Sequence, residues 1–334
     1  MLYPGNITIW LSLLACFLHK GSSQQFFQFH GFAQGTSYHV SYYAATPLVE
    51  RREVDSILLR IDSSLSIYKS YSLISRFNSS ADGVQMDEYF KAVAQKSFEV
   101  YHRTKGKFDI TVAPLVQLWG FGPNAISKFP EQTVIDKTLA NVGMDLIGLR
   151  GNRLTKKKPD VQIDMNGIAQ GYSVDEVARY LDSKGLQSYM VEIGGEIVVK
   201  GSKPDGSGYH IGIEGPPLNG YGPALRKIVS INHGAITTSG NYIKYLQNKN
   251  NRISHLIDPK TGYPLQNSMI SVTLYAKDAI TADGYDNAVM AMGVKEALQF
   301  VAAQKNVEAY LVYRKKDGSV ADTMTLGFQH LIKN

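Results

Sequence analysis

The chain has 334 residues, of which 44% are hydrophobic and 19% are charged, and its formal net charge is +6. This composition is typical of a globular protein with ample material for a core, and it argues against a disordered chain. The basic residues are scattered, and their runs, such as 156–158, are short. Because no nucleic-acid-binding motif accompanies them, the positive charge indicates a solvated surface and no nucleic-acid partner.

The N-terminal segment predicts export. An apolar run over 7–18 is too short to cross a bilayer but has the length of a signal-peptide core. It contains Leu13-Leu14-Ala15-Cys16, which resembles a bacterial lipobox, although no Lys or Arg precedes the run. Cys16 is the only cysteine, which excludes an internal disulfide. We expect a signal segment at 1–23, either lipidated at Cys16 or simply cleaved near Gly21, followed by one domain at 26–334.

Alternating apolar residues predict strands near 27–29 and 38–42, and amphipathic spacing predicts helices over 49–65 and 87–104. A loop is expected at 121–124, then a short strand at 161–163 and a helix over about 167–184. The second half is richer in strands, at 189–193, 196–200, 210–213, 227–232, 270–276 and 307–313, with helices at about 280–292 and 294–305 and a hairpin turn at 316–318. Since these elements follow no regular βα repeat, the predicted class is one large α+β domain.

The stretch 282–288 carries the strongest chemical signal. Asp283, Asp286 and Asn287 stand at i, i+3 and i+4 of the expected helix, so their oxygens lie on one face. No Lys or Arg occurs between Lys277 and Lys295 to balance the carboxylates. Hard oxygen ligands on a rigid element suit Mg²⁺ shared with substrate phosphates. The alternative is a helix start whose acidic residues complement the helix dipole.

Two further regions contain functional side chains. In 164–175 a strand ends at Asp164 and a glycine-containing turn opens a helix, whose free N–H groups can face a phosphate. The turn lacks both the Walker pattern and the dinucleotide fingerprint. Segments 233–242 and 255–262 contain hydroxyl groups, His255 at the start of a short expected strand, and Asp258. Taken singly, His255 can be a general base or a structural histidine, and Asp258 a turn former.

In this order, the motifs resemble the ApbE family, the Mg²⁺-dependent FAD:protein FMN transferases of bacterial envelopes. The resemblance covers nearly all of the chain after the signal segment. It is carried by residues 34–36, 65–68, 75–78, 108–115, 118–123, 164–175, 193–196, 238–240, 255–262 and 282–287.

The resemblance implies a flavin-binding cleft in which FAD is the substrate and Mg²⁺ lies near its pyrophosphate. The FMN half would pass to a Thr hydroxyl of an acceptor protein, for example an electron-transfer flavoprotein subunit, with release of AMP. By motif position, the metal ligands would be the Gly167 carbonyl, Asp283 and Asn287, with Asp286 beside them. Contacts to the flavin nucleotide would fall at Gln34, Tyr68, Lys107, Phe108, Asp109, Asp164, Gln170 and Ile257.

Three positions depart from the commoner family pattern: Asn287 stands in place of Thr, Gln170 in place of Lys or Glu, and Gln34 in place of Met. An Asn carbonyl can still bind Mg²⁺. Because phosphoryl-type transfer needs positioning and charge neutralisation rather than an enzyme nucleophile, the expected catalytic residues are Asp283, which holds the metal, and His255 as base. The alternatives are a pyrophosphatase that hydrolyses FAD to FMN and AMP, and a non-catalytic flavin-binding lipoprotein. The expected location is the outer side of the bacterial inner membrane, or the soluble periplasm.

Overall fold

The structure is a computed structural model that describes residues 24–124, 126, 128–217, 224–241, 245–248 and 251–333. Its largest element is an eight-stranded antiparallel sheet in the order β1-β2-β6-β7-β10-β13-β14-β15. These strands are β1 (Gln25–Ala33), β2 (Thr36–Ala44), β6 (Tyr189–Ile193), β7 (Glu196–Lys200), β10 (His233–Gly240), β13 (Met269–Ala276), β14 (Glu308–Arg314) and β15 (Val320–Met324). The smaller sheets are formed by β3 (Gly83–Gln85), β5 (Arg153–Lys156) and β4 (Ile147–Arg150), by β8 (Tyr209–Gly215) and β9 (Ala224–Ile231), and by β11 (Tyr245–Asn248) and β12 (Asn251–Ser254).

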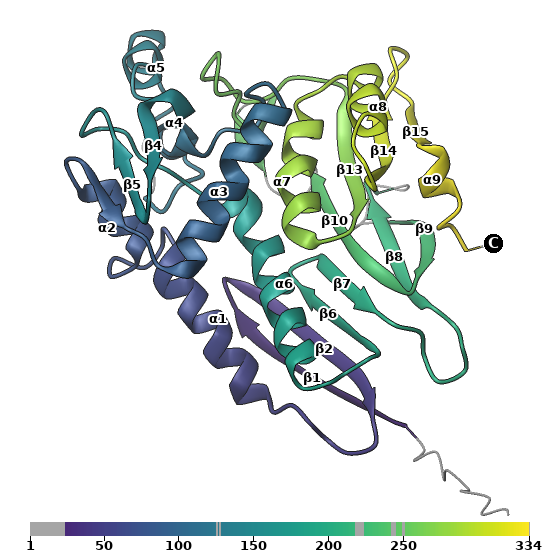
Figure 1. The fold of residues 1–334 in the computed structure, drawn as a ribbon. Helices are drawn as coiled ribbons and strands as arrows, with labels where there is room; N and C mark the ends of the chain where they lie inside the picture. The colour runs from purple at the N-terminus through teal and green to yellow at the C-terminus, as the bar shows by residue number, and fades with distance from the viewer. Residues whose placement is uncertain are drawn as a thin grey trace, which may run out of the picture.

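The described helices are α1 (Arg51–Leu65), α2 (Leu73–Ser79), α3 (Glu88–Arg103), α4 (Ala113–Leu118), α5 (Gln132–Leu139), α6 (Asn166–Ser183), α7 (Ala279–Met290), α8 (Val294–Ala302) and α9 (Leu326–Gln329), with 3-10 turns at Ile110–Val112 and Met144–Leu146. Helices α1, α6, α7 and α8 pack on one face of the large sheet, with α3 against α1, α6 and α7 (Figure 1). The main core lies between these helices and the sheet. A second core lies on the other face, beneath β8, β9 and α9. This arrangement confirms the predicted single mixed α+β domain.

The segment before α6 differs from its prediction as a strand. Residues 161–165 belong to no helix and to no sheet. The Asn78 side chain takes the place of a neighbouring strand: its Nδ2 donates to the Ile163 carbonyl at 2.9 Å and its Oδ1 accepts from the Ile163 N–H at 2.8 Å. The Asp164 N–H donates to the Ile110 carbonyl. Because these partners lie far away in the sequence, local apolar composition could not reveal them.

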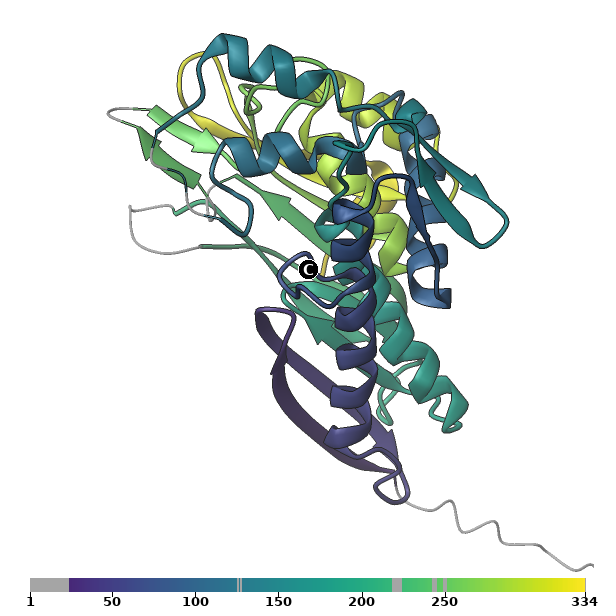
Figure 2. The same ribbon diagram turned by 90° about the vertical axis from the view of Figure 1, so that its left-hand side faces the viewer.

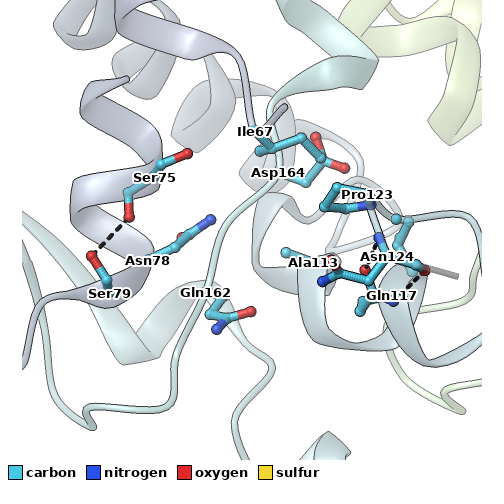
Figure 3. Close-up of a pocket in the computed structure, with 12 residues that line it drawn as sticks. Ile67, Ser75, Asn78, Ser79, Ala113, Gln117, Pro123, Asn124, Gln162 and Asp164 are labelled. Atoms are coloured by element: carbon cyan, nitrogen blue, oxygen red, sulfur yellow. Dashed lines mark hydrogen bonds between the residues drawn. The ribbon is translucent and has the colours of Figure 1, made fainter. Parts of the chain in front are cut away.

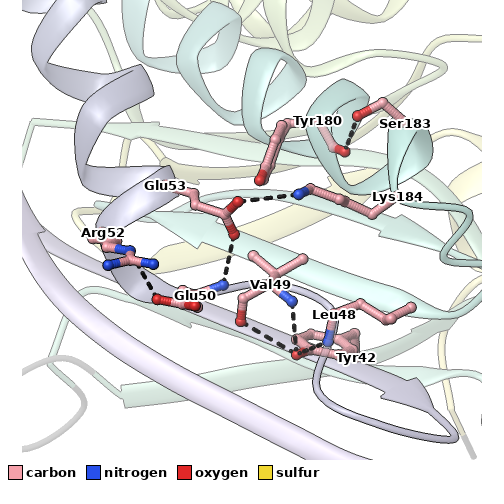
Figure 4. Close-up of polar contacts among 9 residues, drawn as sticks. All are labelled: Tyr42, Leu48, Val49, Glu50, Arg52, Glu53, Tyr180, Ser183 and Lys184. Atoms are coloured by element: carbon pink, nitrogen blue, oxygen red, sulfur yellow. Dashed lines mark hydrogen bonds and ion pairs between the residues drawn. The ribbon is translucent and has the colours of Figure 1, made fainter.

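A polar contact joins the first helix to the end of α6, as Figure 4 shows. Glu53 in the first turn of α1 accepts a hydrogen bond from the Glu50 N–H at 2.8 Å and pairs with Lys184 at 3.0 Å. The backbone N–H of Glu50, followed by the side chains of Tyr180 and Lys184, lowers the pKa of Glu53 to about 2. This pair adds a polar contact to the packing of α1 against α6. The two helices stand side by side in the turned view as well (Figure 2).

The expected signal segment at 1–23, including Cys16, lies outside the described residues. Within the part of the chain that the structure describes, no helix is both long and apolar enough to cross a membrane.

Candidate active site

The four residues expected to hold a metal meet where α6 contacts α7. The Asp283 carboxylate accepts a hydrogen bond from the Gly171 N–H of α6 at 2.7 Å. One turn further along α7, Asn287 donates through Nδ2 to the Gly167 carbonyl at 3.4 Å. Asp286 stands beside them, buried like Asp283. The spacing in the sequence therefore predicted correctly that these side-chain oxygens lie in one region. The structure shows in addition that a strand, β10, faces them.

Strand β10 faces the α7 side chains with alternate hydroxyl groups. The Thr237 hydroxyl donates to Asp286 at 2.8 Å, and the Ser239 hydroxyl donates to the Asn287 side-chain oxygen at 2.9 Å. Thr238, between them, bonds instead with Thr273 of β13. Because successive strand residues point to opposite faces, only the first and third hydroxyl of this cluster reach the site. Their role is to orient the α7 side chains.

Glu196 is a third acidic residue near this point, which sequence reasoning did not single out. It begins β7 and is buried, and one of its oxygens has no hydrogen-bond partner among the described residues; the same is true of one oxygen of Asp286. Burial, followed by the charges of Asp283 and Asp286, raises the pKa of Glu196 well above its usual range. Burial raises the pKa of Asp283 to about 7, and burial with the charge of Asp283 raises that of Asp286.

These carboxylates form no ion pair with a basic side chain in the described ranges. Buried carboxylates are costly unless protons or a cation neutralise them. The orphaned oxygens and the all-oxygen donor set therefore fit Mg²⁺, which accepts amide and backbone carbonyls as well as carboxylates. Among the described residues, no group of three or more His, Cys, Asp or Glu side chains is arranged as a metal site. The expected ligand set contains only two carboxylates.

The alternative reading of 282–288, as acidic residues at a helix start, does not hold. Helix α7 begins at Ala279, and no Asp or Glu occurs in its first turn. Asp278 caps this end instead, by accepting from the Thr281 N–H at 3.0 Å. Asp283 and Asp286 lie deeper in the helix and point to α6 and β10, so the dipole does not explain their burial.

Gln34 and Gln170 are two of the expected flavin contacts; Gln34 contacts α6, and Gln170 belongs to it. Gln34, with a positive φ of 53°, donates to the Ser173 hydroxyl at 2.8 Å. Gln170 donates to the Ile193 carbonyl at 3.0 Å, at the turn between β6 and β7. Gly194 of that turn has a positive φ of 62°, and an added Cβ would lie 1.9 Å from the Gln170 Nε2, so the turn favours glycine.

A cavity of about 250 Å³ opens beside the start of α6, and Asp164 lines it (Figure 3). Its wall combines Ser75, Asn78 and Ser79 of α2 with the loop after α4; the other lining residues are Ile67, Ala113, Val116, Gln117, Gly122, Pro123, Asn124 and Gln162. Burial raises the pKa of Asp164 to about 6. The charge of Asp164 also contributes, after burial, to the raised pKa of Tyr68, which indicates that the exposed Tyr68 ring lies near the same carboxylate.

The remaining expected contacts occupy different environments. Asp109 is turned into its own backbone and accepts from the Thr111 N–H at 2.7 Å. Lys107 pairs with Glu296 at 3.6 Å. The buried Phe108 ring approaches Gly167, where an added Cβ would lie 3.8 Å from it. Of these three, Phe108 is the one placed against the expected metal ligands.

His255 comes directly after β12, so the expectation that it begins a strand was wrong: the strand ends where it was expected to start. It is half-buried, with its ring 6.3 Å from that of Phe121, whose loop continues into the cavity wall. Ile257 is buried and forms an isolated bridge with Pro264. Asp258 accepts from the Lys260 N–H at 2.8 Å, which confirms it as a turn former.

The chain resembles known flavin transferases over almost its whole length. The family model described as the ApbE family matches residues 34–311. The chain is 36% identical to the FAD:protein FMN transferase of Haemophilus influenzae, over 94% of this chain and 93% of that protein, and 34% identical to that of Vibrio cholerae, over 92% and 95%. The solved apo structure of the Pseudomonas stutzeri flavinyl transferase ApbE superposes with a TM-score of 0.83 at 34% identity, covering 92% of this chain and 97% of that one. The Vibrio cholerae flavin transferase ApbE gives a TM-score of 0.83 at 32% identity, covering 92% and 99%.

Proposed function

The chain belongs to the ApbE family, and we propose that it is an FAD:protein FMN transferase. FAD is the substrate, and the acceptor is a Thr hydroxyl of a second protein. The hydroxyl oxygen forms a bond to the phosphorus of the FMN half, the bond from that phosphorus to the AMP phosphate breaks, and AMP leaves. The hydroxyl proton passes to a base.

The observation that carries this proposal is the buried acidic site at the junction of α6, α7 and β10. Asp283, Asp286 and Asn287, with the Gly167 carbonyl, would hold Mg²⁺. When bound, Mg²⁺ supplies positive charge that neutralises the pyrophosphate and the leaving AMP. A protein that only stored flavin would not need such a site. Asp164 lines the cavity and comes shortly before α6 in the chain, so a nucleotide held in the cavity would lie close to the metal ligands.

We assign the base to His255. It is half-buried beside the loop that forms part of the cavity wall, and a neutral imidazole can accept a proton near pH 7. Carboxylates that bind Mg²⁺ are poorer bases. Gln34, Tyr68 and Gln170 would contact the flavin nucleotide, along with Ile257 and the 107–109 segment.

The test is to incubate the pure protein with FAD and Mg²⁺, with and without an acceptor domain that contains the target Thr. AMP release that depends on the acceptor, with FMN bound covalently to it, supports transfer. AMP and free FMN without acceptor would indicate a pyrophosphatase. Bound FAD with no AMP under either condition would indicate a storage or delivery protein and would overturn the proposal.

We also propose that the protein is exported and held at the outer side of the bacterial inner membrane through an acylated Cys16. The short apolar segment and the sequence Leu13-Leu14-Ala15-Cys16 support this. Mass spectrometry of the mature N-terminus tests it: a diacylglycerol-modified Cys16 is expected. A mature chain that begins near Gln24 without lipid would indicate a soluble periplasmic enzyme.

A further inference from the structure

Helices α6 and α7 are joined by three sets of hydrogen bonds at regular intervals. Gly167 pairs with Asn287, Gly171 pairs with Asp283, and Asp175 pairs with Ala279 and Ile280. Successive sets are four residues apart along each helix. The residue numbers rise along α6 as they fall along α7, so the two helices are antiparallel and are bonded once in each turn. We call these three sets the α6–α7 ladder.

Asp175 forms the end of the ladder that lies farthest from the expected metal ligands. Both of its carboxylate oxygens are engaged: Oδ1 accepts from the Ala279 N–H and Oδ2 from the Ile280 N–H, each at 2.9 Å. These N–H groups belong to the first turn of α7 and have no partner within that helix. Asp175 therefore binds the start of α7 from a neighbouring helix. Its two hydrogen bonds restrict both the sliding of α7 along its axis and its rotation about that axis.

The middle set of the ladder depends on very close approach of the two helices. An added Cβ at Gly171 would lie 2.4 Å from the Ala279 carbonyl oxygen and 2.7 Å from the Asp283 Cβ. At this separation a small slide or rotation of α7 changes which α6 backbone group Asp283 meets. By fixing the start of α7, the hydrogen bonds of Asp175 also fix the position of Asp283, one helical turn further along, and of Asn287, two turns further along.

We propose that Asp175 is a positioning residue for the metal site: its double hydrogen bond sets the register in which α7 presents Asp283 and Asn287 to the Gly167 carbonyl. This inference rests on the proposed metal site. It assigns Asp175 no contact with substrate or metal. Asp278 provides a matched control, because it caps the same helix by accepting from the Thr281 N–H and, among the described residues, its side chain forms no hydrogen bond to α6.

The experiment compares Asp175→Asn, Asp175→Ala and Asp278→Ala with the wild-type protein, each prepared without metal. An amide at 175 keeps the size of the carboxylate but can accept at only one atom, so Asp175→Asn is the variant expected to fold most like the wild type. Isothermal titration with Mg²⁺ alone measures affinity. Hydrogen exchange of the metal-free proteins measures protection of the backbone amides in 167–175 and 279–287.

If Asp175 sets the register, both of its variants lose Mg²⁺ affinity by tenfold or more and lose amide protection in both helices. Asp278→Ala should stay within about twofold of wild-type affinity and lose protection in α7 alone, as expected for a capping residue. Equal effects of the Asp175 and Asp278 changes would overturn the inference and leave Asp175 as an ordinary cap. Wild-type protein that turns over FAD but binds no Mg²⁺ would instead refute the metal site, and the hydrogen-exchange comparison would still decide whether Asp175 couples the two helices.

Discussion

In the proposed function, Asp283 combines two roles in one side chain. One oxygen accepts the Gly171 N–H, which ties α7 to α6, and the carboxylate charge is the feature that a cation requires. Burial already raises its pKa to about 7, so the charged form is costly unless a cation is present. The two functions can be separated by substitution.

Asp283→Asn and Asp283→Ala should both lose Mg²⁺-dependent transfer by at least about 100-fold, because a metal ligand supplies several kcal/mol of transition-state stabilisation. Asp283→Asn keeps an acceptor for Gly171 and should melt at a higher temperature than Asp283→Ala. Steady-state AMP release at saturating FAD, together with thermal melting, checks both points. Activity comparable with wild type in either variant, without added metal, would contradict the metal assignment.

His255→Asn should slow transfer by about 10²–10⁴-fold, the usual contribution of a positioned base, while FAD affinity changes much less. Asn retains hydrogen-bonding capacity but cannot take up the hydroxyl proton. Single-turnover transfer and FAD titration separate the two quantities. If the variant loses FAD binding but turns over bound FAD normally, His255 is a binding group, and the base must be sought elsewhere, first at Asp286.

At the scale of elements, amphipathic periodicity predicted α1 and α3 to within about two residues. The helix expected after the 161–163 segment matches α6 as closely, and the hairpin of β6 and β7 was predicted at its observed bounds. The strand expected at 161–163 failed because its partner is the side chain of Asn78, 85 residues away. The sequence of β10 indicated a hydroxyl cluster but no strand. The α6–α7 ladder was not predicted either, since its partners are more than 100 residues apart and glycine backbone groups leave no signature of which helix they approach.

Gly171→Ala should destabilise the protein by about 1–3 kcal/mol and weaken Mg²⁺ binding, because the new Cβ must push α7 away from α6. Gly148→Ala is the matched control: Gly148 has no positive φ, and an added Cβ would meet only the Thr155 Oγ1, at an ordinary contact distance of 3.5 Å. It should change stability by no more than about 0.5 kcal/mol. Urea unfolding of the two variants measures the difference, and equal stabilities would contradict the close packing.

For the whole molecule, the acidic site is the point where four separate segments of the chain meet. Asp283 and Asp286 come from α7, Glu196 from β7, and the polar groups that hold them from α6 and β10. When no metal is bound, the burial of these carboxylates close to one another destabilises the folded state. Metal binding and global stability should therefore be linked through pH.

The sign of that link follows from the pKa values. Asp283 and Asp175 titrate at about 7 and Asp164 at about 6, all raised from an unfolded value of 3.8 chiefly by burial. The folded state binds more protons than the unfolded one, so stability present at low pH is lost as pH rises through 6 and 7. Metal-free protein should therefore lose stability, on the order of a few kcal/mol, between pH 5 and pH 8.

Added Mg²⁺ should raise the melting temperature more at pH 8 than at pH 5.5, because its ligands must be deprotonated. Asp283→Asn removes one of the titrating groups and should flatten the pH profile of the metal-free protein. Melting curves with EDTA and with Mg²⁺ at both pH values test this link. A melting temperature that rises from pH 5.5 to pH 8 in EDTA would show that the buried carboxylates are already neutralised by a partner other than a proton or a metal ion.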